Sequence, residues 1–104
     1  MSLKDLKIKT SIVKRIGKEL VFYESDALKQ EARIQSLIDS GADIHDVRKQ
    51  QEVLKETTDM FPDVKKRLEK SRLDLAELVS VMSKSSVFLD SEEFLAASQV
   101  LQES

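Results

Sequence analysis

The sequence predicts an all-α protein: an elongated antiparallel three-helix bundle made of two long helices and a short third one. Three observations lead to this prediction. The 104-residue chain has only two glycines and one proline, and 35% of its residues are charged, which is typical of long helices. Apolar residues recur every seven positions along most of the chain. Stretches at residues 39–43 and 83–86 have turn composition and divide this pattern into three parts. The length suits one core, so we expect a single domain over residues 1–104.

The first helix is predicted over about residues 5–39, where there is no proline. Apolar residues lie seven apart at Leu6, Val13, Leu20, Ala27 and Ile34, and Ile16, Tyr23 and Leu37 follow members of this series by three places. Lys9 and Gln30 interrupt the apolar seam. Gly17 should cost the helix up to about 1 kcal/mol relative to alanine. It marks either a close approach between helices or a surface position.

Residues 39–43 form the clearest turn in the sequence. Gly41 can adopt the left-handed backbone conformation that ends a helix, and Asp43 can cap the start of the next one. A connection this short makes the two flanking helices antiparallel neighbours.

The second helix is predicted over about residues 44–82, with a kink at Pro62. Its apolar series is Val47, Leu54, Phe61, Leu68, Leu75 and Met82. A proline inside a helix either ends it or kinks it. We predict a kink, because the seven-residue spacing keeps its phase across Pro62 and no turn-forming cluster surrounds it. The main packing seam is then expected to comprise Val13, Ile16, Leu20, Tyr23, Leu54, Phe61, Leu68 and Leu75.

A linker is predicted over residues 83–89, followed by a third helix over about 90–102. The linker contains the serine-rich stretch 83–86. Asp90 and Glu93 match a capping box, and Leu89 and Phe94 have the spacing of a hydrophobic staple. Two helices near 35 residues and one near a dozen residues are therefore expected.

Charge is unevenly distributed along the chain. The net charge is −2, but residues 1–20 contain six basic and two acidic side chains, whereas residues 74–104 contain six acidic side chains and Lys84. This dipolar distribution fits packing of the chain's own two ends against each other, or a partner with charged patches. A nucleic-acid partner is not expected, because the chain is acidic overall and its basic stretch lacks interleaved aromatic residues.

The sequence offers little that could carry catalysis. Cysteine is absent, which excludes thiolate chemistry and cysteine-based metal sites. His45 is the only histidine, and its neighbours Asp43 and Asp46 are better explained by helix capping and the helix dipole. There is no glycine-rich phosphate loop, no apolar run long enough to span a membrane, and no secretory signal. We therefore expect a cytosolic protein that is not an enzyme and uses no cofactor or metal.

Several apolar residues fall on the outward positions of the heptads. They are Val21, Phe22, Leu28 and Leu73. Either the third helix and its linker cover them, or they form an exposed apolar surface for a partner. In the second predicted helix, Asp63 and Arg67 have the i, i+4 spacing of a helical ion pair.

Seven segments of the sequence resemble those of a known family. They are Leu6-Lys7-Ile8-Lys9-Thr10, Val13-Lys14-Arg15-Ile16, Lys18-Glu19-Leu20-Val21-Phe22-Tyr23-Glu24, Lys49-Gln50-Gln51-Glu52-Val53-Leu54-Lys55-Glu56, Met60-Phe61-Pro62-Asp63, Arg67-Leu68-Glu69 and Asp74-Leu75. In order and spacing they cover most of residues 6–79, and this pattern resembles the tubulin-folding cofactor A family. The specific feature is the proline-bearing run inside a predicted helix.

The resemblance implies a bundle that binds β-tubulin after its release from the cytosolic chaperonin, before heterodimer assembly. It also implies a cytoplasmic, cytoskeleton-associated protein that works without nucleotide, metal or catalysis. Because tubulin is an acidic partner, basic residues of the first helix lead the candidates for binding it. The full candidate set is Lys7, Lys9, Lys14, Arg15, Lys18, Phe22, Glu24, Lys49, Glu52, Asp63 and Arg67. Gly41 and Pro62 are expected to have structural roles.

Two other classes of function remain open from the sequence. One is a generic helical scaffold, either a spectrin-like repeat or a homo-oligomeric coiled coil; the other is an adaptor with a helical groove. The absence of tryptophan and the short third helix speak against the spectrin-like repeat. Heptad seams serve packing within and between chains equally well, so a homodimer is possible.

Overall fold

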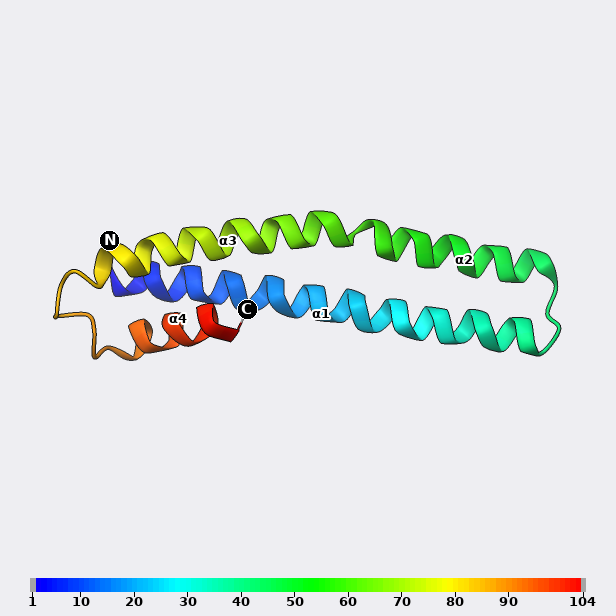
Figure 1. Ribbon diagram of the computed structural model, residues 1–104, viewed down its shortest axis with the longest axis horizontal. Coiled ribbons are helices and arrows are strands. Elements are labelled where there is room, and N and C mark those ends of the chain that lie inside the picture. The colour runs from blue at the N-terminus through cyan, green and yellow to red at the C-terminus, as the bar shows by residue number, and fades with distance from the viewer. Residues whose placement is uncertain (1, 104) are drawn as a thin grey trace. The chain divides into compact units, whose positions relative to one another are not determined.

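The computed structural model describes residues 2–103, and their regular structure consists of four α-helices without strands. These are α1 (Leu3–Asp39), α2 (Ile44–Asp59), α3 (Phe61–Met82) and α4 (Glu92–Glu103) (Figure 1). The predicted all-α class is confirmed. In the part of the chain described, no helix is long and apolar enough to cross a lipid bilayer.

The chain forms two compact units that share α1. Of the described residues, the terminal unit contains 2–18 and 66–103, and the central unit contains 19–65. The helix α1 runs through both units without a break, so the two units are not separated by a linker in this helix. The single domain expected for residues 1–104 stays a prediction.

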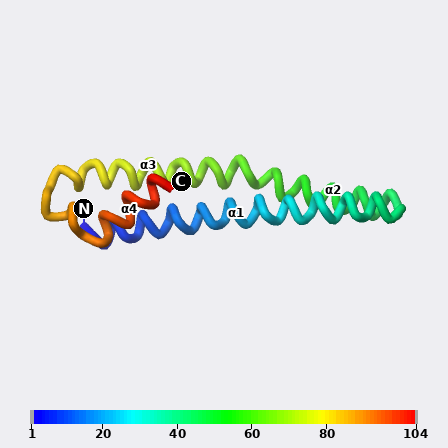
Figure 2. Tube along the Cα trace, turned by 60° about the horizontal axis from the view of Figure 1, so that its bottom comes forward, coloured from blue at the N-terminus to red at the C-terminus, as the bar shows by residue number. Residues whose placement is uncertain are grey.

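The terminal unit has a core built from the first part of α1, from α3 and from α4. These three segments lie side by side in both views (Figures 1 and 2). The buried residues of this core are Leu6, Val13, Leu75, Leu78, Met82, Ala97 and Val100. Phe88 and Phe94 pack against it from the linker and from α4. The short last helix therefore buries its apolar face on the two longer ones.

The central unit consists mainly of the second part of α1 and of α2, which run antiparallel (Figure 1). Its buried apolar residues are Ala27, Ile34, Val47 and Val64. Gln30 is also buried, and its Nε2 donates hydrogen bonds to Asp26 Oδ2 at 2.9 Å and to Thr57 Oγ1 at 3.0 Å. The interruption predicted in the heptad is thus a polar contact that joins α1 to α2.

The turn between α1 and α2 has the predicted chemistry. Gly41 has a φ of +74°, a left-handed conformation that residues with a Cβ seldom adopt. The Ala42 N–H donates to the Leu37 carbonyl at 3.0 Å, and such bonds satisfy the last carbonyls of a helix. Asp43 caps α2, because its side chain accepts a hydrogen bond from the His45 N–H at 2.9 Å.

The second predicted helix, residues 44–82, is divided into α2 and α3 at a single residue, Met60. Met60 keeps a right-handed helical backbone with φ −76° and ψ −22°. Proline has no N–H and its ring crowds the preceding turn, so it fits best in the first turn of a helix. Here Pro62 is the second residue of α3. The helix is interrupted where the kink was predicted, but the predicted continuous helix is two helices, and no loop separates them.

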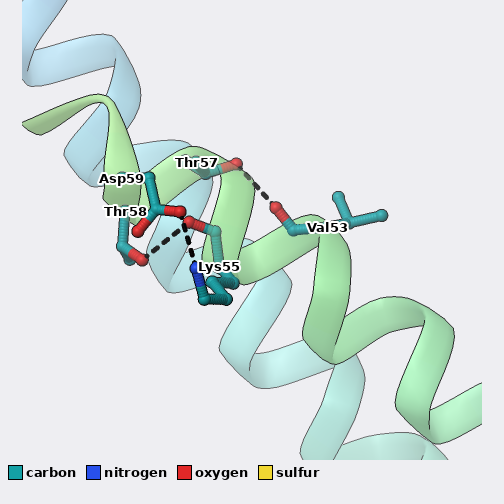
Figure 3. A network of polar contacts seen from close by, with 5 residues as sticks. All are labelled: Val53, Lys55, Thr57, Thr58 and Asp59. Carbon is teal, nitrogen blue, oxygen red and sulfur yellow. Dashed lines mark hydrogen bonds and ion pairs between the residues drawn. The ribbon is translucent and has the colours of Figure 1, made fainter.

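Side chains at the end of α2 also compete for its backbone carbonyls (Figure 3). The hydroxyl of Thr57 donates to the Val53 carbonyl at 3.2 Å, and that of Thr58 donates to the Lys55 carbonyl at 3.1 Å. Hydroxyl bonds of this kind bend helices slightly. In the same turn Lys55 Nζ lies 2.9 Å from Asp59 Oδ2.

The third predicted helix begins later than expected, because Ser91 and not Asp90 caps it. Ser91 Oγ accepts a hydrogen bond from the Phe94 N–H at 3.1 Å and donates one to the Phe88 carbonyl at 2.7 Å. A hydroxyl can satisfy a donor and an acceptor at once, whereas a carboxylate only accepts. The helix therefore starts at Glu92, and the capping box predicted for Asp90 is wrong.

The predicted main seam is correct in part. Val13, Ile16 and Leu75 are buried. The remaining members are only half-buried: Leu20, Tyr23, Leu54, Phe61 and Leu68. Four of these belong to the central unit, where two packed helices leave one side of a seam residue open to water. The fully buried Leu6 and Val64 were not included in the predicted seam.

Candidate functional site

Basic residues follow one face of α1 within the terminal unit. The face is made of exposed residues separated by three or four places, and we call it the basic stripe: Lys4, Lys7, Ser11, Arg15 and Lys18. Residues at this spacing stack above one another on a helix. Lys14, which is also exposed, lies beside the stripe. The sequence-based candidates missed Lys4, although the same spacing leads to it.

Two of the candidate lysines face acidic residues of the chain itself. Lys7 and Lys14 line an open hollow of about 240 Å³ together with Glu92 and Glu93 at the start of α4. Figure 2 shows α4 lying along this part of α1. The uneven charge of the sequence is therefore explained in part by packing between the two ends of the chain, one of the two explanations that the sequence left open.

Lys9 lies in a second acidic environment. It lines a hollow of about 200 Å³ with Asp74, Glu77, Leu78 and Val81 of α3. Lys9 is half-buried, unlike the other basic candidates. Its partial burial beside acidic residues of the same chain makes Lys9 a weaker candidate for contact with a partner.

The outward apolar residues are exposed, which answers the question that the sequence left open. In the central unit the exposed fractions of Val21, Phe22 and Leu28 are 65%, 66% and 66%. Leu73, in the terminal unit, is 64% exposed. The Phe22 ring meets Tyr23 edge to face, with 5.9 Å between ring centroids. Exposed groups of large apolar side chains on a charged surface are typical of interaction sites.

The other candidates are also on the surface. Glu24, Lys49, Glu52 and Asp63 are exposed in the central unit, and Arg67 is exposed in the terminal unit. The pairing of Asp63 with Arg67 stays a prediction. Near Asp63, Lys65 Nζ lies 6.0 Å from the centroid of the Phe61 ring, a distance that suits a weak cation–π contact.

Metal-ligating side chains are not clustered in the part of the chain that the structure describes. Residues 2–103 contain no group of three or more His, Asp or Glu side chains that could hold a metal ion. One pKa shift stands out: the hydrogen bond from Lys55 to Asp59, and the attraction between their charges, raise the pKa of Lys55 above its ordinary value of 10.5. His45 is exposed at the start of α2. The exposed candidates are therefore charged side chains and a few large apolar ones, and they lie on helix surfaces.

Comparison with known protein sequences relates most of the chain to one family. Residues 1–101 match the family model for tubulin binding cofactor A. Tubulin-specific chaperone A of Gallus gallus is 36% identical over 100 residues, which cover 96% of this chain and 90% of the relative. Tubulin-folding cofactor A of Arabidopsis thaliana is 39% identical over 84 residues, covering 81% and 74% of the two chains.

Comparison with solved structures agrees. The crystal structure of tubulin folding cofactor A from Arabidopsis thaliana superposes with a TM-score of 0.90 at 35% identity, covering 97% of this chain and 92% of that one. Human tubulin chaperone cofactor A gives a TM-score of 0.79 at 35% identity, with coverage of 97% and 95%. Sequence and structure thus agree along nearly the whole length, and the chain belongs to the tubulin binding cofactor A family.

Proposed function

We propose that this protein is a tubulin-folding cofactor that binds and stabilises β-tubulin released from the cytosolic chaperonin, before heterodimer assembly. The observation that carries the proposal is the family match over residues 1–101. Two relatives named tubulin-specific chaperone A are each 36% identical to this chain and cover 95% or more of it. The role is one of binding in the cytoplasm, without catalysis, metal or cofactor.

The surface supports a mode of binding that is spread over many weak contacts. All the candidate residues except the half-buried Lys9 are exposed on helices, and the hollows near them are open to solvent. An exposed ion pair contributes only about 0.2–1 kcal/mol, so affinity depends on many such contacts together. Phe22 is the exception, since an exposed aromatic ring that becomes buried at an interface can contribute about 2 kcal/mol or more.

Weak and distributed contacts suit a protein that holds a folding subunit only for a time. Complementary charges speed up the encounter between two proteins and orient them. Because each contact is weak, a competing partner can replace them one after another. Temporary capture followed by transfer is therefore what this surface supports, and it needs no chemical step in this chain.

The proposal is tested by capture of newly released β-tubulin. We would incubate the purified chain with β-tubulin discharged from chaperonin and separate the complexes by native electrophoresis, with α-tubulin as the specificity control. Wild-type protein is expected to retain β-tubulin and not α-tubulin. Failure to retain β-tubulin, or equal retention of α-tubulin, would refute the proposed role.

Two variants separate the contributions of charge and apolar contact. Reversing Lys14, Arg15 and Lys18 to Glu should weaken capture strongly, mainly through slower association, and added salt should reduce the difference. Reversing the exposed Lys66, Lys70 and Lys84 is the matched control. Phe22→Ala should cost about 2 kcal/mol if this ring is an anchor. Normal binding by the first variant at every salt concentration would assign the main role to the apolar residues.

A homo-oligomeric helical module is the second candidate function. The exposed Val21, Phe22 and Leu28 in the central unit favour it, because such residues also mediate self-association. Sedimentation equilibrium over a wide concentration range tests this alternative. A dimer that Phe22→Ala converts to monomer would support it.

A further inference from the structure

The basic stripe on α1 has five members between Lys4 and Lys18, and none of them is acidic. From Lys4 to Lys18 its members are separated by three, four, four and three residues, and four of the five are cationic. All five are exposed. Ser11 separates the two pairs of cations with a short side chain that can donate or accept a hydrogen bond. The terminal unit thus presents a narrow line of positive charge in a chain whose net charge is −2.

The length of the stripe limits what can occupy it. Fourteen helical steps of 1.5 Å correspond to about 21 Å. An extended polypeptide advances about 3.3 Å per residue, so a segment of about six or seven residues would match the whole stripe. A carboxylate on every second residue would then meet a cation at nearly every helical turn.

Acidic side chains already occupy one border of the stripe. Glu92 and Glu93 of α4 line the same hollow as Lys7 and Lys14. No ion pair within 4.0 Å is formed between these two glutamates and the two lysines among the described residues. Carboxylates are therefore accommodated next to the stripe, yet the lysines keep their capacity to donate to a partner. A nucleic acid fits less well, because the stripe carries no aromatic side chain on which bases could stack.

We propose that the basic stripe binds a short acidic polypeptide segment, about six or seven residues long and rich in Asp or Glu, of the protein that this chain captures. The inference rests on the proposed function, since it specifies the chemistry of the partner at the same basic residues. It adds Lys4 to the surface. It also implies that Glu92 and Glu93, which line the hollow with Lys7 and Lys14, repel the carboxylates of the bound segment.

The test uses a fluorescein-labelled peptide of seven glutamates and the full chain, with fluorescence anisotropy at two salt concentrations. One variant replaces Lys4, Lys7, Arg15 and Lys18 by Gln. The matched control replaces Arg48, Lys66, Lys70 and Lys84, which are equally exposed, so both variants change the net charge by the same amount. Circular dichroism verifies that both keep the helix content of the wild type.

We expect the wild type to bind the peptide more tightly at low salt than at high salt. Each exposed contact contributes about 1.4- to 5-fold in affinity, so the stripe variant should bind roughly four-fold more weakly or worse, and the control should change little. Glu92→Gln with Glu93→Gln should strengthen binding, because it removes two negative charges that repel the peptide. A peptide of seven glutamines should not bind.

The inference fails if the peptide does not bind, or if the stripe variant and the control bind equally. It also fails if a single-stranded oligonucleotide of equal charge binds as tightly as the peptide, since the stripe would then be a general polyanion site. Capture of β-tubulin by the wild type is measured in parallel. Capture without peptide binding overturns the acidic-segment inference alone, whereas peptide binding without capture overturns the proposed function.

Discussion

Replacing Gln30 by leucine should stabilise the central unit. Gln30 is only 7% exposed and lies at a seam position of α1. Its Nε2 makes two hydrogen bonds, but its Oε1 is buried with no hydrogen-bond partner among the described residues. An unsatisfied buried polar atom costs about 1–3 kcal/mol. The side chain therefore both joins α1 to α2 and carries a penalty.

The expected magnitude follows from three contributions. The Gln30→Leu change would remove the unsatisfied oxygen, a gain of about 2 kcal/mol, and would add apolar burial of roughly 1–2 kcal/mol. It would lose two hydrogen bonds, together about 2–3 kcal/mol. The losses stay moderate because Asp26 is half-buried and can bind water, and because the Thr57 hydroxyl still donates to Val53. The net expectation is a gain of about 1 kcal/mol in the free energy of unfolding.

The measurement is urea unfolding followed by circular dichroism at 222 nm. Gln30→Ala is the control, because it loses the same hydrogen bonds without new apolar contact and leaves a cavity, so it should destabilise by about 1–2 kcal/mol. If Gln30→Leu instead destabilises by more than about 1 kcal/mol, the two hydrogen bonds outweigh the buried oxygen. The reasoning about this polar contact would then be refuted.

Three further changes test other parts of the structure. Leu75→Ala should lower the free energy of unfolding by about 2–5 kcal/mol, because Leu75 is fully buried in the terminal core; a loss below about 0.5 kcal/mol would contradict this. Gly17→Ala should raise the thermal midpoint through about 0.5–1 kcal/mol of helix propensity, since an added Cβ would meet nothing within 4 Å; a lower midpoint would show hidden crowding. Asp59→Asn should lower the pKa of Lys55, which the carboxylate raises, as NMR titration would show. A pKa raised on folding stabilises below the ordinary value of 10.5, and this contribution is lost as pH rises through the folded-state pKa.

Local signals in the sequence were sufficient for most of the element boundaries. Gly41 and Asp43 act within a few residues of themselves, so their roles follow from side-chain chemistry and backbone geometry alone. Pro62 was correctly taken as the site where the regular helix is disturbed, since its missing N–H is a local property. The start of α4 was predicted one or two residues early. Asp90 and Ser91 are both good capping residues, and the choice depends on the Phe88 carbonyl, to which Ser91 donates.

The packing of the seam was less predictable, because it depends on how many helices surround each position. The heptad spacing marks Leu20 and Leu54 as seam residues as strongly as Val13 and Leu75. In the terminal unit α4 adds a third helix to the core, and Val13 and Leu75 are buried there. Leu20 and Leu54 belong to the central unit, which consists mainly of two helices, and they are only half-buried. Periodicity predicts which face of a helix is apolar, but it does not predict how much of that face other helices bury.

The candidate site was predictable as a list of residues but not as a surface. The basic residues of α1 are visible in the sequence, yet their separation into an exposed line and a half-buried Lys9 follows from tertiary packing. That packing brings Glu92 and Glu93, about 80 residues away along the chain, beside Lys7 and Lys14. The exposure of Phe22 likewise depends on tertiary packing and not on sequence spacing.

The net charge of the chain does not prevent it from attracting an acidic partner. At physiological ionic strength the Debye length is about 8 Å, so an approaching carboxylate responds to the charges nearest to it and not to the total of −2. Along the basic stripe those charges are Lys4, Lys7, Arg15 and Lys18, without an acid among them. The acids of α4 lie at one edge of the stripe, in the hollow that Lys7 and Lys14 line, and they reduce the positive potential on that side only. Attraction should therefore follow the stripe and not the net charge, so neutralising its four cations should slow association more than neutralising four cations elsewhere does.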